Sequence, residues 1–332
     1  MMTTSVKSPA RLGAPRYCIV SPVRNEAEFM RRTLDSVVGQ TVPPDLWVIV
    51  DDGSTDETPA ILADYAARFP YIRVVKRADR GKRRVGGGVV EAFDEGWAVA
   101  REGRFDYLTK LDMDLELPLG YFEELIALME ADPRLGTVSG KAYHPGPSNP
   151  EGRFGGELIS EAIGDDVSLG MTKFWRRTAF EEIGGLVPFV MWDGMDCYMM
   201  RMKGWRACSI DRADLRFIHL RPMGSSDRNI LVGRQRHGLG HWFMGSSPLF
   251  VLASALFRLQ FRPVLIGSLA MLLGYVKAAL GGQPRYPDRA FRKALRAYQW
   301  AMLLHGKAGA VRRTEARGEA LWRQRHATGG LE

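Results

Sequence analysis

The chain has 332 residues, the composition of a globular protein and a formal net charge of +8. Apolar residues make up 45% and charged residues 25%, so the chain can bury a full core and lacks the composition typical of disorder. Its three cysteines, Cys18, Cys197 and Cys208, form no closely spaced pair. This sparse, odd set argues against a disulfide scaffold and favours a reducing compartment.

The two ends of the chain differ in character. Residues 1–16 are polar, are broken by proline and glycine, and lack the apolar region of a secretory signal, so we expect a flexible lead-in. Residues 284–332 hold eleven Lys and Arg against four Asp and Glu, which accounts for +7 of the net charge. Such a tail is either a solvated helical face or a surface attracted to anionic lipid headgroups. It carries no recognition motif for nucleic acid, so we expect no nucleic-acid partner.

The first half of the chain alternates short apolar runs with helical patterns. Four runs predict buried strands at residues 17–22, 46–50, 72–75 and 105–111. Helices are expected over residues 26–39 and 86–100, after Asp56 and from Pro118. This alternation predicts an α/β fold with a parallel sheet and right-handed crossovers.

The second half is less regular. Strands are predicted over residues 138–143, 168–174 and 215–220, and short helices over 178–183 and 194–203. Two strongly apolar runs follow, at residues 248–257 and 263–276, and neither reaches the length of a standard membrane span. They are either core helices or a pair of interfacial helices beside the basic tail, and we favour the second interpretation.

Polar residues follow three of the predicted strands. These residues are Arg24, Asn25 and Glu26 after the first, Asp51 and Asp52 after the second, and Asp112 and Asp114 after the fourth. Ligands of an open parallel sheet bind beyond the carboxyl ends of its strands, so we expect the three clusters to form one site. Asp112 and Asp114 can converge on Mg²⁺ or Mn²⁺, which substrate phosphates would complete. The alternative is a pair of turn carboxylates, because this spacing is common.

Three other features could contribute to such a site, and each has a simpler structural explanation. Asp52 can accept a hydrogen bond from a nucleobase, or it can belong to a simple Asp-Gly turn. The basic run 80–84, which includes Lys82, precedes three glycines and can approach a diphosphate, or it can be a solvated loop. His219 ends an apolar strand and is either a metal ligand through its neutral imidazole or a structural histidine.

Two carboxylates, Asp193 and Asp196, open a predicted helix. They can act as helix-capping groups through hydrogen bonding and the favourable dipole sign. Transfer to an acceptor hydroxyl also needs a base that takes the proton of that hydroxyl. A carboxylate at a helix start can fulfil both roles.

With these residues in view, the chain resembles the family 2 glycosyltransferases of the GT-A fold. The resemblance runs from about Tyr17 to Leu220 and rests on SPVRNE at 21–26, VIVDDGSTDET at 48–58 and LDMD at 111–114. Many relatives of this kind build bacterial exopolysaccharide or lipid-linked glycans. The resemblance implies a GT-A domain at residues 17–225, with a helical, apolar and basic extension at 226–332.

The resemblance also implies roles for single residues. Those implied for the nucleotide-sugar pocket are Pro22, Arg24, Asn25, Glu26, Asp52, Lys82 and Asp112, with Asp52 on the base, which we expect to be uracil. Asp114 and His219 would bind Mn²⁺ or Mg²⁺, and Asp112 would face ribose or the metal. The third aspartate that usually follows is replaced by Leu115.

The base is implied by a pair of acidic residues that often opens a late helix in this family. Asp196 is the expected base, because Arg201 and Gly204 follow it as in the family. The preceding glutamate is replaced by Met195, so Asp193 stays open as the alternative. Inverting members of the family use a single displacement. Arg176 and Arg177 are candidates for contacts with the acceptor or the diphosphate; the alternative is that they form an exposed basic turn.

The expected function is therefore transfer of a sugar from a UDP-sugar to a glycan or polyprenyl-linked acceptor. We expect the protein in the cytoplasm, peripheral to the inner membrane and attracted to its anionic surface. Two alternatives remain: a catalytically degenerate scaffold or regulator, motivated by Leu115 and Met195, and a sugar nucleotidyltransferase. A nicotinamide-dependent oxidoreductase is disfavoured, because SPVRNE stands where a GxGxxG turn would follow the first strand.

Overall fold

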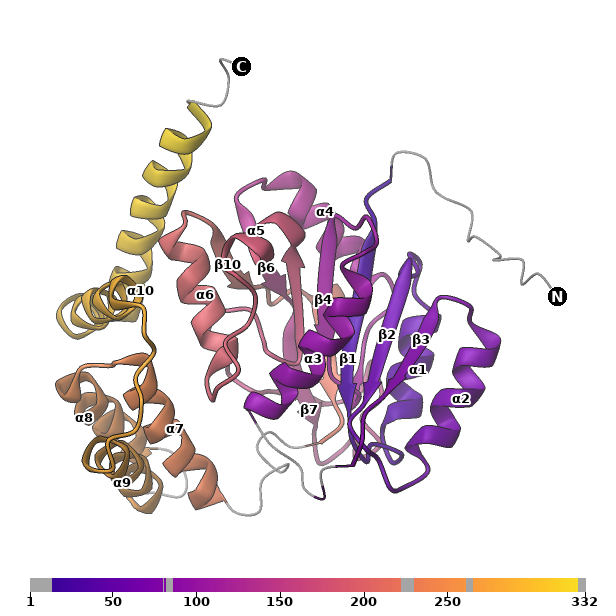
Figure 1. The fold of residues 1–332 in the computed structure, drawn as a ribbon, viewed down its shortest axis with the longest axis horizontal. Coiled ribbons are helices and arrows are strands. Elements are labelled where there is room, and N and C mark those ends of the chain that lie inside the picture. Colours follow the sequence, from indigo (N-terminus) through magenta and orange to yellow (C-terminus); the bar gives the residue numbers. More distant parts are fainter. Residues whose placement is uncertain (1–13, 80, 82–85, 222–229, 261–264, 328–332) are drawn as a thin grey trace. The chain divides into compact units, whose positions relative to one another are not determined.

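The computed structural model describes residues 14–79, 81, 86–221, 230–260 and 265–327 (Figure 1). The chain forms two compact units. The first unit comprises Met1–Arg84, Gly88–Gly184 and Ala207–Arg221, and the second comprises Val85–Gly87, Gly185–Arg206 and Pro222–Glu332. This division differs from the boundary predicted at residue 225, because residues 185–206 belong to the second unit.

The first unit is built on a seven-stranded sheet with the order β10-β6-β9-β4-β1-β2-β3. Its strands are β1 (Tyr17–Val23), β2 (Leu46–Asp51), β3 (Ile72–Lys76), β4 (Tyr107–Leu111), β6 (Leu135–Ser139), β9 (Thr172–Arg176) and β10 (Arg206–Ser209). The first four strands pair in parallel, as their alternation with helices predicts. Strand β9 runs antiparallel to both β4 and β6, so the complete sheet is mixed.

Helices cover both faces of this sheet. They are α1 (Met30–Val38), α2 (Thr58–Arg68), α3 (Gly87–Ala100), α4 (Tyr121–Ala131) and α5 (Arg177–Glu182). Trp47 and Ile49 of β2 share a buried cluster with residues of α1, α2 and α4. Val48 points the other way, towards α3, where a Cβ on Gly96 would lie 2.5 Å from Val20 Cγ1. The glycine therefore lets α3 pack closely on the sheet.

A second, four-stranded sheet has the order β5-β11-β7-β8. Its strands are β5 (Leu115–Glu116), β7 (Lys141–Pro145), β8 (Leu158–Ser160) and β11 (Arg216–His219), the last preceded by the 3₁₀ turn η1 (Ala213–Leu215). The single strand predicted over residues 138–143 is therefore wrong, because β6 and β7 belong to different sheets. Gly140 lies between them, and a Cβ there would fall 1.8 Å from the carbonyl oxygen of Leu215. This close backbone approach, invisible in the sequence, separates the strands.

The second unit is helical. It contains α6 (Trp192–Met202), α7 (Ile230–Met244), α8 (Pro248–Phe257), η2 (Arg258–Gln260), α9 (Ile266–Leu280) and α10 (Arg289–Ala327). Val251 and Ala255 of α8 pack with Met271 and Tyr275 of α9, so each apolar run is partly a core element. Helix α10 is interrupted at Gly306, which has a φ of 68°. Within the described residues, no helix combines the length and the apolarity needed for a membrane crossing.

Candidate functional site

The loops after β1 and β2 are joined by hydrogen bonds through Asn25. This residue adopts a left-handed backbone conformation with a φ of 53°. Its side-chain oxygen accepts a hydrogen bond from the Thr55 N–H at 2.8 Å, and its own N–H donates to Ser54 Oγ at 3.0 Å. Asn25 therefore holds the two strand ends together, and asparagine suits this position because it adopts the left-handed conformation more readily than most residues. Pro22, also predicted for the pocket, is half-buried in β1 opposite Val50 of β2.

Asp52 lies at the end of β2 among positive charges. Its Oδ1 is 2.6 Å from a guanidinium nitrogen of Arg77, and its backbone carbonyl accepts a hydrogen bond from Arg24. Arg24 also contacts Asp79 Oδ1 at 2.7 Å. Gly53 allows this arrangement, because a Cβ there would lie 2.5 Å from Asp79 Cα and its φ is 75°. The DG sequence is thus needed for the loop of Asp79 to approach β2.

The end of β4 is joined to β11 by the short strand β5. Leu115 pairs with His219, and the Leu220 N–H donates to the Asp114 carbonyl at 2.9 Å. This pairing brings His219 next to Asp114, although the two residues lie 105 positions apart in the sequence. Leu115 is fully buried, so the apolar residue at this position belongs to the core.

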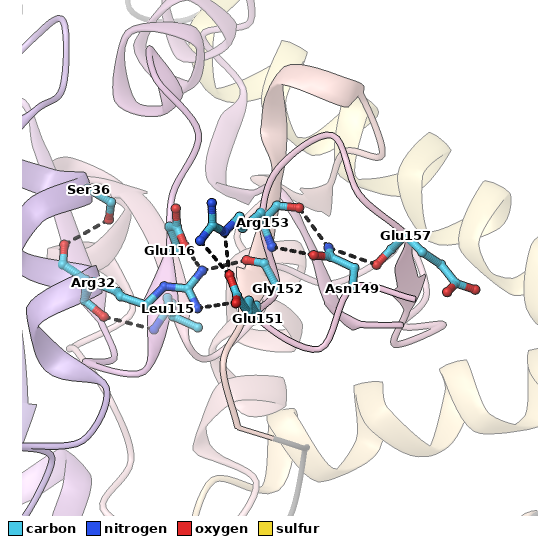
Figure 2. A network of polar contacts seen from close by, with 10 residues as sticks. Arg32, Ser36, Leu115, Glu116, Asn149, Glu151, Gly152, Arg153 and Glu157 are labelled. Carbon is cyan, nitrogen blue, oxygen red and sulfur yellow. Dashed lines mark hydrogen bonds and ion pairs between the residues drawn. The ribbon is translucent and has the colours of Figure 1, made fainter. Parts of the chain in front are cut away.

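Helix α1 fixes the position of β5. The Leu115 N–H donates to Thr33 Oγ1 at 3.0 Å, and Arg32 pairs with Glu116. Figure 2 shows the Arg32 guanidinium between Glu116 and the loop at Gly152, whose carbonyl it contacts at 2.6 Å. Because β5 has only two residues, these contacts supply the rigidity that its own pairing lacks.

His219 lies between two carboxylates. Its Nδ1 donates to Glu161 Oε1 at 2.7 Å, and its Nε2 is 3.7 Å from Asp114 Oδ2. Burial lowers the pKa of His219, but the two carboxylates outweigh burial and raise the pKa to about 9. Burial would raise the pKa of Asp114, yet His219 and Arg221 outweigh it and hold this pKa below its usual range. Both shifts favour the charged forms, so a cation bound by Asp114 and His219 would displace the proton from the ring nitrogen that faces Asp114.

Arg221 connects the end of β1 with this pair. It forms an ion pair with Glu26, and its Nε lies 3.8 Å from Asp114 Oδ2. Glu26 is only 5% exposed, and its backbone N–H donates to Thr58 Oγ1 at 2.9 Å. The buried Glu26 therefore orients Arg221 towards Asp114, and residues after β1, β4 and β11 meet at one edge of the first unit.

Asp112 faces a lysine. Its Oδ1 pairs with the Lys110 ammonium, whose side chain is 3% exposed, while the Asp112 side chain is 35% exposed. The buried ammonium neutralises one side of Asp112 and leaves the accessible side for a polar ligand.

Asp114 and His219 fit a divalent cation as a pair of ligands. Two neighbouring ligands of an octahedral ion at about 2.1 Å lie about 3 Å apart, close to the 3.7 Å between Asp114 Oδ2 and His219 Nε2. Glu161 accepts the other ring N–H, the arrangement that orients metal-bound histidines. Its Oε2 is buried without a hydrogen-bond partner among the described residues. No group of three or more His, Cys, Asp and Glu side chains suited to a metal occurs within the described ranges. Mg²⁺ is usually held by one or two protein carboxylates and completed by water and substrate phosphates.

Asp193 and Asp196 lie in α6 of the second unit. Asp193 is exposed in the first turn, whereas Asp196 is 1% exposed and its Oδ1 accepts the Cys197 N–H at 2.8 Å. A base must reach the hydroxyl that it deprotonates. Solvent access therefore favours Asp193, which is the reverse of the preference drawn from the sequence.

Two further predictions concern basic residues. Lys82 lies outside the described residues. Arg176 pairs with Tyr107 at the start of β4, whereas Asp112 follows the end of that strand. The guanidinium groups of Arg176 and Arg177 donate to the backbone carbonyls of Met129 and Gly103 at 2.6 Å. Both arginines bind backbone at the opposite end of the strands from Asp112, so the structure gives no support to their predicted substrate contacts.

Four residues of the site were missed in the sequence, namely Arg77, Lys110, Glu161 and Arg221. Lys110 and Arg221 each lie two residues from a predicted site residue, so alternation along the strand could have indicated them. Glu161 follows a three-residue edge strand and carries no comparable signal.

Known proteins resemble the chain in sequence and in fold. The model of the family described as glycosyl transferase family 2 matches residues 18–204. Over 116 residues the chain is 28% identical to a poly-β-1,6-N-acetyl-D-glucosamine synthase of Staphylococcus epidermidis, covering 35% of this chain and 26% of that protein. Over 127 residues it is 28% identical to a β-monoglucosyldiacylglycerol synthase of Synechocystis, covering 37% and 25%.

An uncharacterised protein of Mycobacterium tuberculosis is 46% identical over 55 residues, which is 16% of each chain. The matched stretches thus span about a quarter or less of these relatives. Among solved structures, the mannosyltransferase PcManGT of Pyrobaculum calidifontis, in complex with GDP-Man and Mn²⁺, has a TM-score of 0.50 and 19% identity. The comparison covers 92% of this chain and 87% of that one, and it supports the predicted GT-A fold.

Proposed function

Because the chain belongs to glycosyl transferase family 2, we propose that it transfers a sugar from a UDP-sugar to a hydroxyl of a glycan or lipid-linked acceptor, with inversion and with a divalent cation. The observation that carries this proposal is the Asp114–His219 pair, held by Glu161 beside Arg221. A carboxylate on one ring nitrogen and a ligand carboxylate beside the other is an arrangement found around metal-bound histidines. The cation held there would face the diphosphate of the donor.

The donor is assigned to the residues after β1, β2 and β4. Asp52 is proposed to accept a hydrogen bond from the uracil N–H, since a carboxylate at that strand end can act as the acceptor. Asp112 is proposed to face the ribose through its accessible side, while Asp114 and His219 bind Mn²⁺ or Mg²⁺. The bound cation would neutralise the charge on the departing diphosphate.

This chain's own groups perform the remaining work. Arg221, oriented by Glu26, supplies a positive charge near Asp114 that favours the anionic donor. Asp193 is proposed as the base that accepts the proton of the acceptor hydroxyl, with Asp196 as the alternative. Exposure supports Asp193, because a buried carboxylate cannot contact an incoming acceptor without rearrangement.

Peripheral association with the cytoplasmic face of an anionic membrane is proposed for the second unit. Helices α8 and α9, together with Leu265 just before α9, leave large apolar side chains exposed: Leu249, Leu252, Leu256, Phe257, Leu265, Ile266, Leu269, Leu273, Val276 and Leu280. Exposed apolar surface on this scale marks an interaction site. The basic tail adds attraction to anionic headgroups, about 1 kcal/mol for each cation near the surface.

A catalytically degenerate scaffold is the alternative that Leu115 and Met195 suggested. Both residues are fully buried, which explains their apolar character without loss of a catalytic group. This observation weakens the case for degeneracy.

The proposal is tested by incubating the full chain with Mn²⁺ and a panel of UDP- and GDP-sugars. Release of nucleoside diphosphate with one donor is expected, and Asp114→Asn should reduce Mn²⁺-dependent donor binding about 10-fold or more. Asp132→Asn, at the end of α4, is the control with the same charge change. Absence of release with every donor, together with absence of metal-dependent nucleotide binding, would favour the scaffold.

A further inference from the structure

A pocket of about 410 Å³ opens on the first unit beside helix α1, and it shares no residue with the donor, metal or base assignments. Its walls come from α1, from β5 with the residues that follow it, and from the loop that carries Phe154. Small-molecule sites commonly enclose about 300–1,000 Å³, so this pocket is large enough for such a ligand. All of its lining residues lie within the described ranges of the first unit.

Two side chains tie α1 to the other walls of the pocket. Near the start of the helix, Arg32 pairs with Glu116 and donates to the Glu151 carbonyl oxygen at 2.8 Å. Just after the helix ends, the buried Gln40 donates from Nε2 to the Pro118 carbonyl oxygen at 2.9 Å. The chain therefore fixes the walls at both ends of the helix, and the pocket between them is preformed.

The loop that carries Phe154 is held by the buried Asn149. The Asn149 Nδ2 donates to the carbonyl oxygens of Arg153 and Glu157 at 2.9 and 3.2 Å, as Figure 2 shows. Gly156 permits this arrangement, because a Cβ there would lie 2.5 Å from the Asn149 amide carbon. Phe154 itself is 41% exposed, so a well-held loop presents an aromatic ring that the fold leaves partly uncovered.

The polar groups of the pocket offer hydrogen-bond acceptors. Asp35 accepts the Tyr65 hydroxyl with Oδ1, and Glu116 meets Arg32 with Oε2. Among the described residues, the second carboxylate oxygen of Asp35 and of Glu116 takes part in no hydrogen bond. The lining holds one cation and two carboxylates, a net charge of −1 (1 minus 2), which disfavours a phosphate or another anion.

Exposed apolar side chains line the pocket beside these acceptors. Leu119 is 72% exposed and Phe154 is 41% exposed. A saccharide matches both kinds of surface, because its hydroxyl groups donate to carboxylate oxygens and the C–H faces of its rings pack on apolar and aromatic side chains. A purely apolar ligand would instead cover the carboxylate oxygens without pairing them.

We propose that this pocket binds a saccharide unit of a glycan, away from the end at which transfer takes place. The proposal rests on the proposed function for the source of this unit, since a glycan acceptor or product would carry it. Glu116 follows Asp114 by two residues, which is about 7 Å along an extended strand. One wall of the pocket is therefore close to the proposed metal site, and a glycan held at both places gains affinity with its length.

The first arm of the test measures binding of four trisaccharides to the full chain by ligand-observed NMR titration, without donor or metal. The probes are cellotriose, maltotriose, mannotriose and triacetylchitotriose, and wild type is expected to bind at least one of them. Asp35→Asn keeps the shape and the acceptor for Tyr65 but removes the charge, and it should weaken this binding by about 10-fold. Asp214→Asn, an exposed residue of η1 outside the pocket, makes the same change and should bind as wild type does.

The second arm concerns the aromatic ring. Phe154→Ala should weaken binding by about 5-fold or more, because the sugar loses its apolar platform, whereas Phe154→Tyr keeps the ring and should bind as wild type does. Ile159→Ala is the control, since Ile159 is 40% exposed and lies outside the pocket. Thermal unfolding of each variant checks that it is folded.

The proposal is overturned if wild type binds none of the four trisaccharides, or if either Asp35→Asn or Phe154→Ala binds as its control does. Binding of spermidine in place of all four trisaccharides would also refute it, because the ligand would then be a cation. Donor hydrolysis by wild type is measured separately, with Mn²⁺. Its absence counts against the proposed function, whereas hydrolysis without trisaccharide binding counts against the pocket alone.

Discussion

Glu161 offers the sharpest test of the metal site, because it touches the proposed ligand and not the metal. Its Oε1 accepts the His219 Nδ1–H at 2.7 Å, and its side chain is only 4% exposed. Glu161→Gln keeps the shape and an acceptor oxygen but removes the charge that makes the ring a strong donor to a cation. A hydrogen bond to a charged group contributes about 1.5–3 kcal/mol, which corresponds to about 10–100-fold in affinity. Loss of such an outer carboxylate has the same effect on metal sites in general.

The assay is a calorimetric titration of the full chain with Mn²⁺ in the presence of UDP, which gives the affinity for the ion. Glu157→Gln is the matched control, since Glu157 is exposed and contacts Ser148, not His219. Thermal unfolding of both variants checks that they are folded. The reasoning is refuted if Glu161→Gln binds Mn²⁺ as tightly as wild type, or if Glu157→Gln loses the same affinity.

Three further predictions concern the second unit. Asp193→Asn should lower turnover by at least about 100-fold and leave donor binding unchanged, as loss of a general base does. Steady-state kinetics measures this loss; if only Asp196→Asn shows it, Asp196 is the base. Burial, together with Arg258 and His237, lowers the pKa of His241 to about 4 in the folded chain. As the pH falls from 6.5 to 4, the unfolded chain therefore takes up a proton that the folded chain does not. The free energy of unfolding should fall by up to about 3 kcal/mol over this range. Urea unfolding should show a smaller fall for His241→Gln, and an equal fall would contradict the assignment. Gly274→Ala should destabilise the chain by about 1–3 kcal/mol, because the added Cβ clashes with α7. Gly194→Ala, which has open space around it, should instead stabilise α6. Equal melting temperatures for the two variants would disprove the close contact between α9 and α7.

The sequence by itself determined the parallel part of the sheet and predicted the strand ends at which the site would form. Apolar runs of strand length alternate with helices, and this pattern admits a parallel arrangement with polar residues at the carboxyl ends. Asp52, Asp112 and Asp114 could therefore be assigned to one edge from local pattern alone. The family motifs gave the same residues chemical roles and identified the fold.

Only the tertiary structure decided which side chains meet. Glu161 reaches His219 across 58 positions of the chain, and Arg221 reaches Glu26 across 195, so neither contact leaves a periodic trace in the sequence. The division of residues 138–143 between two sheets depends on the approach of Leu215 to Gly140, and the choice between Asp193 and Asp196 depends on burial within the second unit. Local pattern fixes elements and their order, whereas burial and pairing between distant segments depend on packing that no single segment encodes.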